Sequence, residues 1–212
     1  MAQPFKRGAK VSAPGKVDKD VGDFWVDNPW DIVGEGHNLS NHERQRLYMN
    51  QGGKAFHDLS FLSGADSDGD GRSVVAADFR NNGQLDLVVR KSGGGPLALY
   101  ENQFPKRHYL EVSLRGTKSN RLGIGSRLVA IVNGQQIVRE LYPLNSFRSQ
   151  MPNTVHFGLG DATNVERLTI RWPSGLVQEL SGVAGDRHIV VEEGKEGASA
   201  IETVIPGKTI RP

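Results

Sequence analysis

The sequence predicts an all-β fold, either sandwich-like or part of a propeller. Short stretches in which apolar and polar residues alternate recur from residue 46 to residue 193, and turn residues separate them. Regular spacing of this kind is typical of β-sheet proteins. Glycine contributes 26 of the 212 residues, which indicates many tight turns. No segment keeps a helical period over three turns, so we expect little helix.

The individual strands are read from their alternation. In the segment 108–114, Leu110, Val112 and Leu114 alternate with polar residues, which is the pattern of a strand buried on one face. The other segments show shorter versions of the same pattern. The predicted strands are residues 46–50, 73–79, 84–90, 97–102, 108–114, 154–160, 166–172, 175–181 and 186–193, with a turn and a strand within 52–60 and a last strand at 201–205.

Two turns are marked strongly. Asn133-Gly134 is the most favourable short turn sequence for a hairpin, and it predicts that residues 126–141 fold back on themselves. The residues Pro173-Ser174-Gly175 predict a second turn, between two later strands.

The two ends of the chain read as extended arms. Residues 1–44 begin with a polar, basic stretch and contain Phe24, Trp25 and Trp30 outside any strand pattern. Because solvated tryptophan is unfavourable, we expect these three aromatic residues to bind a partner. Residues 194–212 form a tail interrupted by glycine, lysine and proline. The domains between the arms are predicted at 45–106 and 107–193.

Composition excludes several classes of protein. The formal net charge is +2 and no run of Lys and Arg interleaved with aromatic residues occurs, so we expect no nucleic-acid partner. No apolar run of about 18 residues is present, so no transmembrane helix is predicted. Residues 1–19 lack a continuous apolar segment, so no signal peptide is visible. The absence of cysteine excludes disulfides and thiolate chemistry.

The segment AADFRNNGQLDLVV, residues 76–89, has the spacing of a calcium loop between strands. Counted from Asp78, Asn82 is at position 5, Gln84 at 7 and Asp86 at 9, which are positions that supply oxygen ligands. Arg80 stands at position 3, where a carboxylate is usual. The alternative is a tight hairpin with Asn82-Gly83 at its tip and Asp86 bonding the hairpin backbone.

A second acidic loop lies upstream. Asp66, Asp68 and Asp70 alternate and are followed by Gly71, which makes this the better first half of a calcium site. Three neighbouring aspartates repel one another unless a cation neutralises them. No closing carboxylate follows at position 9 or 12, so a further ligand would have to come from elsewhere in the fold. The alternative is a solvated acidic turn, with Arg72 offsetting some charge.

Two stretches resemble known families. LYMNQGGKAFHDLS followed by DFRNNGQLDLVV resembles the FG-GAP or VCBS repeat of calcium-binding β-propellers. The combination of SNRLGIGSRL, HFGLG and IRWPSG resembles the ASPIC/UnbV domain of proteins related to cartilage acidic protein. The resemblance covers residues 45–193. It implies a partial propeller blade at 45–106, followed by a sandwich-like ASPIC/UnbV module at 107–193.

The resemblance also implies a function. It indicates a non-enzymatic structural or adhesion protein that is extracellular, on the cell surface or periplasmic, with calcium as its cofactor. A partial blade leaves strand edges unpaired, so we expect association with copies of the chain or with another protein. The alternative is that residues 23–45 cap that edge within the monomer.

One other function class stays open, a carbohydrate-binding or carbohydrate-active protein that uses the acidic loops. Catalysis would need two carboxylates that converge in a cleft. Trp172 is interpreted as a core residue rather than a platform on which a sugar stacks.

Overall fold

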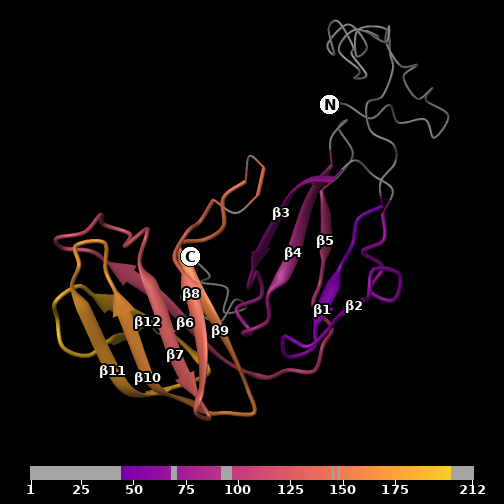
Figure 1. The fold of residues 1–212 in the computed structure, drawn as a ribbon. Coiled ribbons are helices and arrows are strands. Elements are labelled where there is room, and N and C mark those ends of the chain that lie inside the picture. The colour runs from indigo at the N-terminus through magenta and orange to yellow at the C-terminus, as the bar shows by residue number, and fades with distance from the viewer. Residues whose placement is uncertain (1–43, 68–70, 92–96, 145, 148, 202–212) are drawn as a thin grey trace, which may run out of the picture. The chain divides into compact units, whose positions relative to one another are not determined.

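The structure is a computed structural model, and it describes residues 44–67, 71–91, 97–144, 146–147 and 149–201. The described residues form strands and turns and contain no helix, which confirms the all-β prediction (Figure 1). No sheet within this described part closes into a ring. Nor does it include a helix long and apolar enough to cross a membrane.

Most strands begin and end close to their predicted positions. The last strand lies at Ser199–Ile201, whereas it was predicted at 201–205, of which residues 202–205 lie outside the described residues. The strands are β1 Tyr48–Asn50, β2 Phe56–Asp58, β3 Gly71–Ala77, β4 Asp86–Lys91, β5 Ala98–Tyr100, β6 His108–Arg115, β7 Arg127–Val132, β8 Gln135–Glu140, β9 Thr154–Gly160, β10 Asn164–Arg171, β11 Val177–Ala184, β12 Arg187–Glu192 and β13 Ser199–Ile201.

The chain divides into two compact units. The first comprises residues 1–74 and 88–100, and the second comprises residues 75–87 and 101–212. The loop between β3 and β4, which carries the predicted calcium-type residues, therefore belongs to the second unit.

Two four-stranded sheets make up most of the second unit (Figure 1). One has the order β11-β10-β7-β8, and its neighbouring strands are antiparallel. The other has the order β13-β12-β6-β9, in which β12 runs parallel to β6 and the remaining pairs are antiparallel. The buried side chains of both sheets belong to a single hydrophobic cluster.

The predicted alternation decides which residues enter this core. Leu110 and Val112 of β6 are 0% exposed and Leu114 is 5% exposed, as expected. Val155, Phe157 and Leu159 of β9 are buried in the same way. The intervening positions of β6, β9 and β12 point to the other face of the sheet. They include Glu111, Ser113, Thr154, His156 and His188.

Both predicted turns are present. Asn133 has φ 49° and Gly134 has φ 71°, so both lie in the left-handed region that a two-residue hairpin turn requires. They join β7 to β8. In the second turn, the Gly175 N–H donates to the Trp172 carbonyl oxygen at 2.9 Å.

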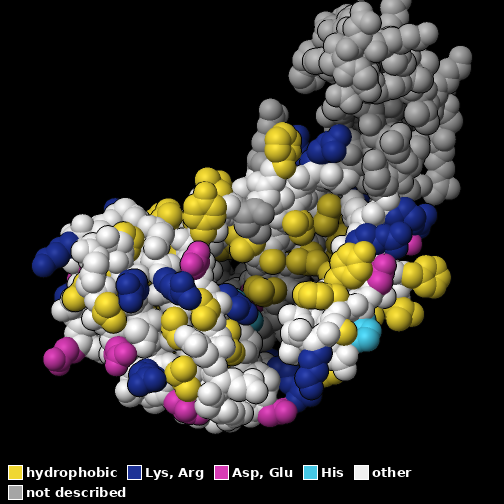
Figure 2. Space-filling view, in the orientation of Figure 1, with side chains coloured by type: hydrophobic (Ala, Val, Ile, Leu, Met, Phe, Trp, Pro, Cys, Tyr) yellow, Lys and Arg dark blue, Asp and Glu magenta, His cyan; other side chains and the backbone are white. Residues whose placement is uncertain are grey.

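The first unit buries few apolar side chains. Its described residues form the two-stranded sheet β1-β2 and parts of the three-stranded sheet β3-β4-β5. Ala65 is the one buried hydrophobic residue among them. Every residue of β1 and β2 is exposed, and hydrophobic side chains cover this region in Figure 2.

Candidate functional site

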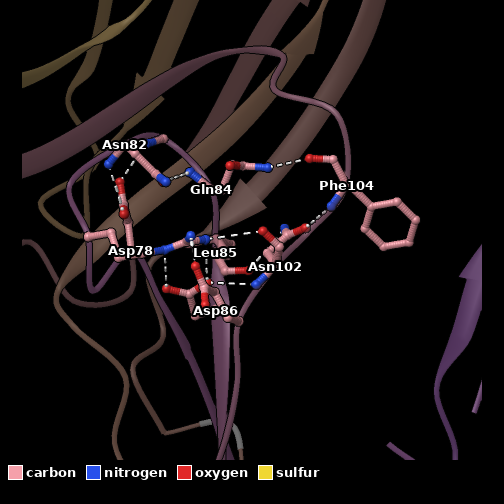
Figure 3. A network of polar contacts seen from close by, with 10 residues as sticks. Asp78, Asn82, Gln84, Leu85, Asp86, Asn102 and Phe104 are labelled. Carbon is pink, nitrogen blue, oxygen red and sulfur yellow. Dashed lines mark hydrogen bonds and ion pairs between the residues drawn. The ribbon is translucent and has the colours of Figure 1, made fainter. Parts of the chain in front are cut away.

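Asp78 binds the backbone of its own loop. Its Oδ1 accepts the Asn82 N–H at 3.0 Å and its Oδ2 accepts the Gly83 N–H at 2.6 Å (Figure 3). The side chain of Asn82 also binds the loop backbone, since its Oδ1 accepts the Gln84 N–H at 2.9 Å. The side chain of Gln84 donates to the Phe104 carbonyl oxygen at 2.7 Å. Each of these predicted ligands therefore has a partner within the protein.

Asp86 is held by Arg80, the residue that departs from the calcium-loop pattern. Arg80 Nε lies 3.2 Å from Asp86 Oδ2, and Arg80 Nη2 lies 2.9 Å from Asp86 Oδ1. The Asn102 N–H also donates to Asp86 Oδ1, at 2.8 Å (Figure 3). Arg80 contacts the Asn102 carbonyl oxygen at 3.1 Å and forms an ion pair with Glu101. Because Asp86 is 2% exposed, its charge depends on these donors.

As folded, the carboxylates of this loop are bound to donors of the protein, and calcium binding here stays a prediction. A calcium site needs six to eight oxygen atoms directed at one point. The carboxylates of Asp78 and Asp86 are instead directed at different donors. In the part of the chain that the structure describes, no group of three or more His, Cys, Asp or Glu side chains is placed to hold a metal ion. The described loop agrees better with the alternative prediction of a tight hairpin. However, Asp78 rather than Asp86 accepts the hydrogen bonds from the hairpin backbone.

Only one aspartate of the upstream acidic loop is described. Asp66 Oδ1 accepts a hydrogen bond from Arg44 Nε at 2.5 Å. This hydrogen bond and the positive charge of Arg44 lower the pKa of Asp66, against a smaller opposing effect of burial. Asp68 and Asp70 lie outside the described residues, as do the predicted partner-binding residues Phe24, Trp25 and Trp30.

The tip of the Asp78–Asp86 loop packs on the outer face of β6 and β9. The Gly83 carbonyl oxygen accepts a hydrogen bond from His156 Nε2 at 2.9 Å. The His156 ring stacks on Tyr109, with 5.8 Å between centroids and 2° between planes. Gly83 has φ 86°, and a Cβ there would lie 2.1 Å from the Tyr109 ring. This close approach explains why glycine stands at the tip.

A pocket of about 360 Å³ lies beside this contact, within the second unit. The outer face of the β6 sheet contributes Glu111, His156 and His188, and the loop contributes Asp78. Burial and the nearby charge of Asp78 raise the pKa of Glu111. The remaining wall is largely apolar and includes Leu85, Leu141, Pro143, Met151, Pro152 and Val155.

The histidines of this pocket favour the neutral form. Burial lowers the pKa of His188. Burial also lowers the pKa of His156, and the hydrogen bond to Gly83 only partly opposes this effect. In the strand register, Glu111 is directly opposite His188 of β12 and His156 of β9. Sequence reasoning missed Glu111 and His188, although their place at outward positions of alternating strands was a signal that could have found them.

A second acidic residue that the sequence analysis missed, Glu193, links the segments SNRLGIGSRL and IRWPSG. Its Oε2 accepts the N–H groups of Thr117, Lys118 and Ser119, each at 2.8 Å. Its Oε1 accepts hydrogen bonds from Ser119 Oγ at 2.9 Å and Ser174 Oγ at 2.5 Å. Burial acts to raise its pKa, but the hydrogen bonds outweigh it and lower the pKa to about 2.

Trp172 occupies the core as predicted. It is 2% exposed, and its Nε1 donates to Gln178 Oε1 at 3.1 Å. Gly123 packs beneath it, since a Cβ on Gly123 would lie 3.2 Å from the Trp172 ring. The segments SNRLGIGSRL and IRWPSG therefore meet, and Gly123 permits their close packing.

Comparison with known proteins agrees with part of the sequence analysis. No curated protein matches the chain. The resemblance of residues 47–60 and 78–89 to FG-GAP or VCBS repeats stays a prediction. Residues 116–198 match the family model described as ASPIC and UnbV, which confirms the ASPIC/UnbV resemblance for that segment of the second unit.

Proposed function

We propose that the chain is a non-enzymatic structural or adhesion module of an extracellular or surface protein, and that it works as a subunit of a larger assembly. The observation that carries this proposal is the exposure of hydrophobic side chains in the first unit. Phe61 is 84% exposed, Leu62 is 82% exposed and Phe56 is 68% exposed. Tyr48 and Met49 of β1 are also exposed.

The strand arrangement supports the same proposal. An isolated two-stranded hairpin is marginally stable in water, and β1-β2 has no buried residue of its own. A row of unpaired backbone groups at a sheet edge invites another strand. In the sheet β3-β4-β5, β5 is an outer strand, and Leu97 and Leu99 are 65% and 63% exposed there. A β-rich protein partner or a further copy of the chain would cover these groups.

We also infer the architecture that this role implies. The single core shared by two sheets supports a β-sandwich for the module. The short strands β1 to β5 support a partial blade that other strands complete. The contacts of Arg80 supply the charge that a cation would otherwise provide at Asp86, which supports a loop that holds together without calcium.

The enzyme alternative has weaker support. Ser113 Oγ lies 2.8 Å from His188 Nε2, in the manner of a hydrolase nucleophile and base. However, His188 Nδ1 lies 3.9 Å from Glu111 Oε2, which is beyond hydrogen-bond distance. Ser113 is also within strand β6, not at the sharp turn that exposes such a nucleophile. Trp172 is buried and offers no face to a sugar.

Light scattering on the full chain over a dilution series tests the assembly. We expect a mass above the 23.2 kDa monomer that falls on dilution. The double variant Phe61→Ser/Leu62→Ser should dissociate at higher concentration than the wild type. The control Val177→Ser changes a residue that is 51% exposed in the second unit, and it should leave association unchanged.

A monomer at every concentration would contradict self-association. Acrylamide quenching then separates the two remaining explanations. Because Trp172 is 2% exposed, quenching reports mainly on Trp25 and Trp30. Shielded tryptophans in a monomer would mean that residues 23–45 cap the chain, whereas accessible tryptophans would mean that a different protein is the partner.

A further inference from the structure

The 360 Å³ pocket in the second unit has an excess of negative charge over its described lining. Asp78, Glu111 and Glu140 contribute carboxylates, and Arg139 contributes the one permanent positive charge among the described lining residues. The two histidines favour the neutral form because burial lowers the pKa of each. The pocket therefore favours a positively charged occupant.

Arg139 does not neutralise the carboxylates. Its guanidinium carbon lies 5.9 Å from the centroid of the Phe157 ring, and its Nη1 donates to the Val138 carbonyl oxygen at 2.9 Å. Among the described residues, no ion pair joins Arg139 to Asp78, Glu111 or Glu140. The guanidinium group of Arg139 is thus directed at the Phe157 ring and the Val138 carbonyl oxygen.

Glu111 is the group that lacks a partner. Its side chain is 18% exposed, and its Oε2 lies 3.9 Å from Nδ1 of His188, which favours the neutral form. No hydrogen bond to its carboxylate is found within the described part of the chain. This contrasts with Asp86 and Glu193, which are each satisfied by several donors. A carboxylate that is largely removed from water needs a donor or a counter-ion.

The shape and the wall restrict the kind of cation. No metal-binding group of side chains is present in the described residues, and the wall formed by Leu141, Pro143, Met151 and Pro152 is apolar. The volume falls within the range of small-molecule sites. An alkylammonium group satisfies both features, because its N–H donors meet the carboxylates and its hydrocarbon part contacts the wall.

We propose that this pocket binds a protonated primary amine on a short alkyl chain, with Glu111 as the principal acceptor and Asp78 as the second anion. The amine is carried either by a small molecule or by a lysine side chain of a peptide. In both cases the ammonium group lies between β6 and the Asp78–Asp86 loop. All of the described lining residues belong to the second unit.

Calorimetric titration of the full chain with n-pentylamine tests the proposal. We expect saturable binding, with n-pentanol binding at least about tenfold more weakly, because one charge-assisted hydrogen bond contributes about a factor of ten or more. Titration with a lysine derivative blocked at its α-amino and carboxyl groups distinguishes a peptide source from a free amine. Equal binding of the amine and the alcohol would overturn the proposal, as would no saturation by either amine.

The variant Glu111→Gln keeps the shape of the side chain and removes its charge. We expect amine affinity to fall about tenfold. The matched control Glu196→Gln changes an exposed carboxylate that does not line the pocket, and it should bind like the wild type. Unchanged affinity in a folded Glu111→Gln variant would contradict the assignment. If that variant does not fold, the comparison of amine with alcohol on the wild type still decides the question.

Discussion

The guanidinium group of Arg80 lies beside the carboxylate of Asp86, with 2.9 Å between Nη2 and Oδ1. In the sequence these residues occupy positions 3 and 9 of a loop with calcium-type spacing. A carboxylate at position 3 would direct a second negative charge toward Asp86, which only a cation could balance. Arg80 supplies that positive charge from within the loop, so the loop is held by its own ion pair with Asp86.

We predict that Arg80→Met destabilises the protein by about 3 kcal/mol, near the lower end for breaking a buried ion pair, because Arg80 is itself partly exposed. The methionine keeps much of the stem but leaves the charge of Asp86 with the Asn102 N–H as its remaining described donor. Urea denaturation measures the change. The control is Arg171→Met on the exposed end of β10, and an equal loss in both variants would contradict a special role for Arg80.

Calcium, if it stabilises this chain, is predicted to bind at the upstream loop of Asp66, Asp68 and Asp70. A ligand that binds only the folded state raises the melting temperature. At a free ligand concentration of 100 times Kd, it stabilises the folded state by about 2.7 kcal/mol. The shift should therefore disappear in Asp68→Asn/Asp70→Asn and persist in Arg80→Met. A shift that survives the first variant and is lost in the second would place the ion at the other loop. No shift in the wild type on adding millimolar calcium after chelation would remove calcium from the function.

Restoring a carboxylate at position 3 tests the same loop directly. Arg80→Asp is expected to gain calcium affinity, because ligand charge count raises affinity in such loops. It should also be less stable than the wild type in the presence of chelator, because Asp86 then faces a like charge. Calorimetry with calcium measures the gain, and an affinity equal to that of the wild type would show that the spacing from Asp78 is not a ligand register.

Glu193 is predicted to make the module sensitive to acid. Its pKa is about 2 in the folded protein and near its ordinary 4.5 in the unfolded chain, so folding favours the ionised form. Its contribution to stability is therefore complete above pH 4.5 and is lost as the pH falls toward 2. Glu193→Gln should lower the melting temperature at pH 7 and flatten its dependence on pH across this window. Glu196→Gln should keep the wild-type profile.

Gly83→Ala is predicted to destabilise the protein more than Gly134→Ala. Both glycines have positive φ, so both substitutions incur backbone strain of about 1–2 kcal/mol. Only at Gly83 would the new Cβ also meet the Tyr109 ring, at 2.1 Å, whereas nothing lies within 4 Å at Gly134. Thermal denaturation compares the two variants. Equal losses would mean that the loop tip does not pack on Tyr109.

The strands and turns of this protein follow from local sequence. The alternation of Leu110, Val112 and Leu114 predicted their burial, because successive side chains of a strand point to opposite faces. Asn133-Gly134 predicted its hairpin, because few residues accept positive φ twice in succession. Trp172 was correctly interpreted as a core residue, because it stands at the end of a strand in which apolar and polar residues alternate.

The partners of the polar side chains were decided only by the tertiary structure. Glu193 binds Thr117, Lys118 and Ser119 across 74 to 76 residues of sequence, and His156 reaches Gly83 across 73. The spacing of residues around Asp78 predicted side chains that bind one calcium ion. In the folded chain, each of these side chains has a different hydrogen-bond partner. Alternation fixes which face a residue occupies, whereas the contacts on that face depend on which strands become neighbours. That pairing, including the parallel pair of β12 with β6, is a property of the whole chain.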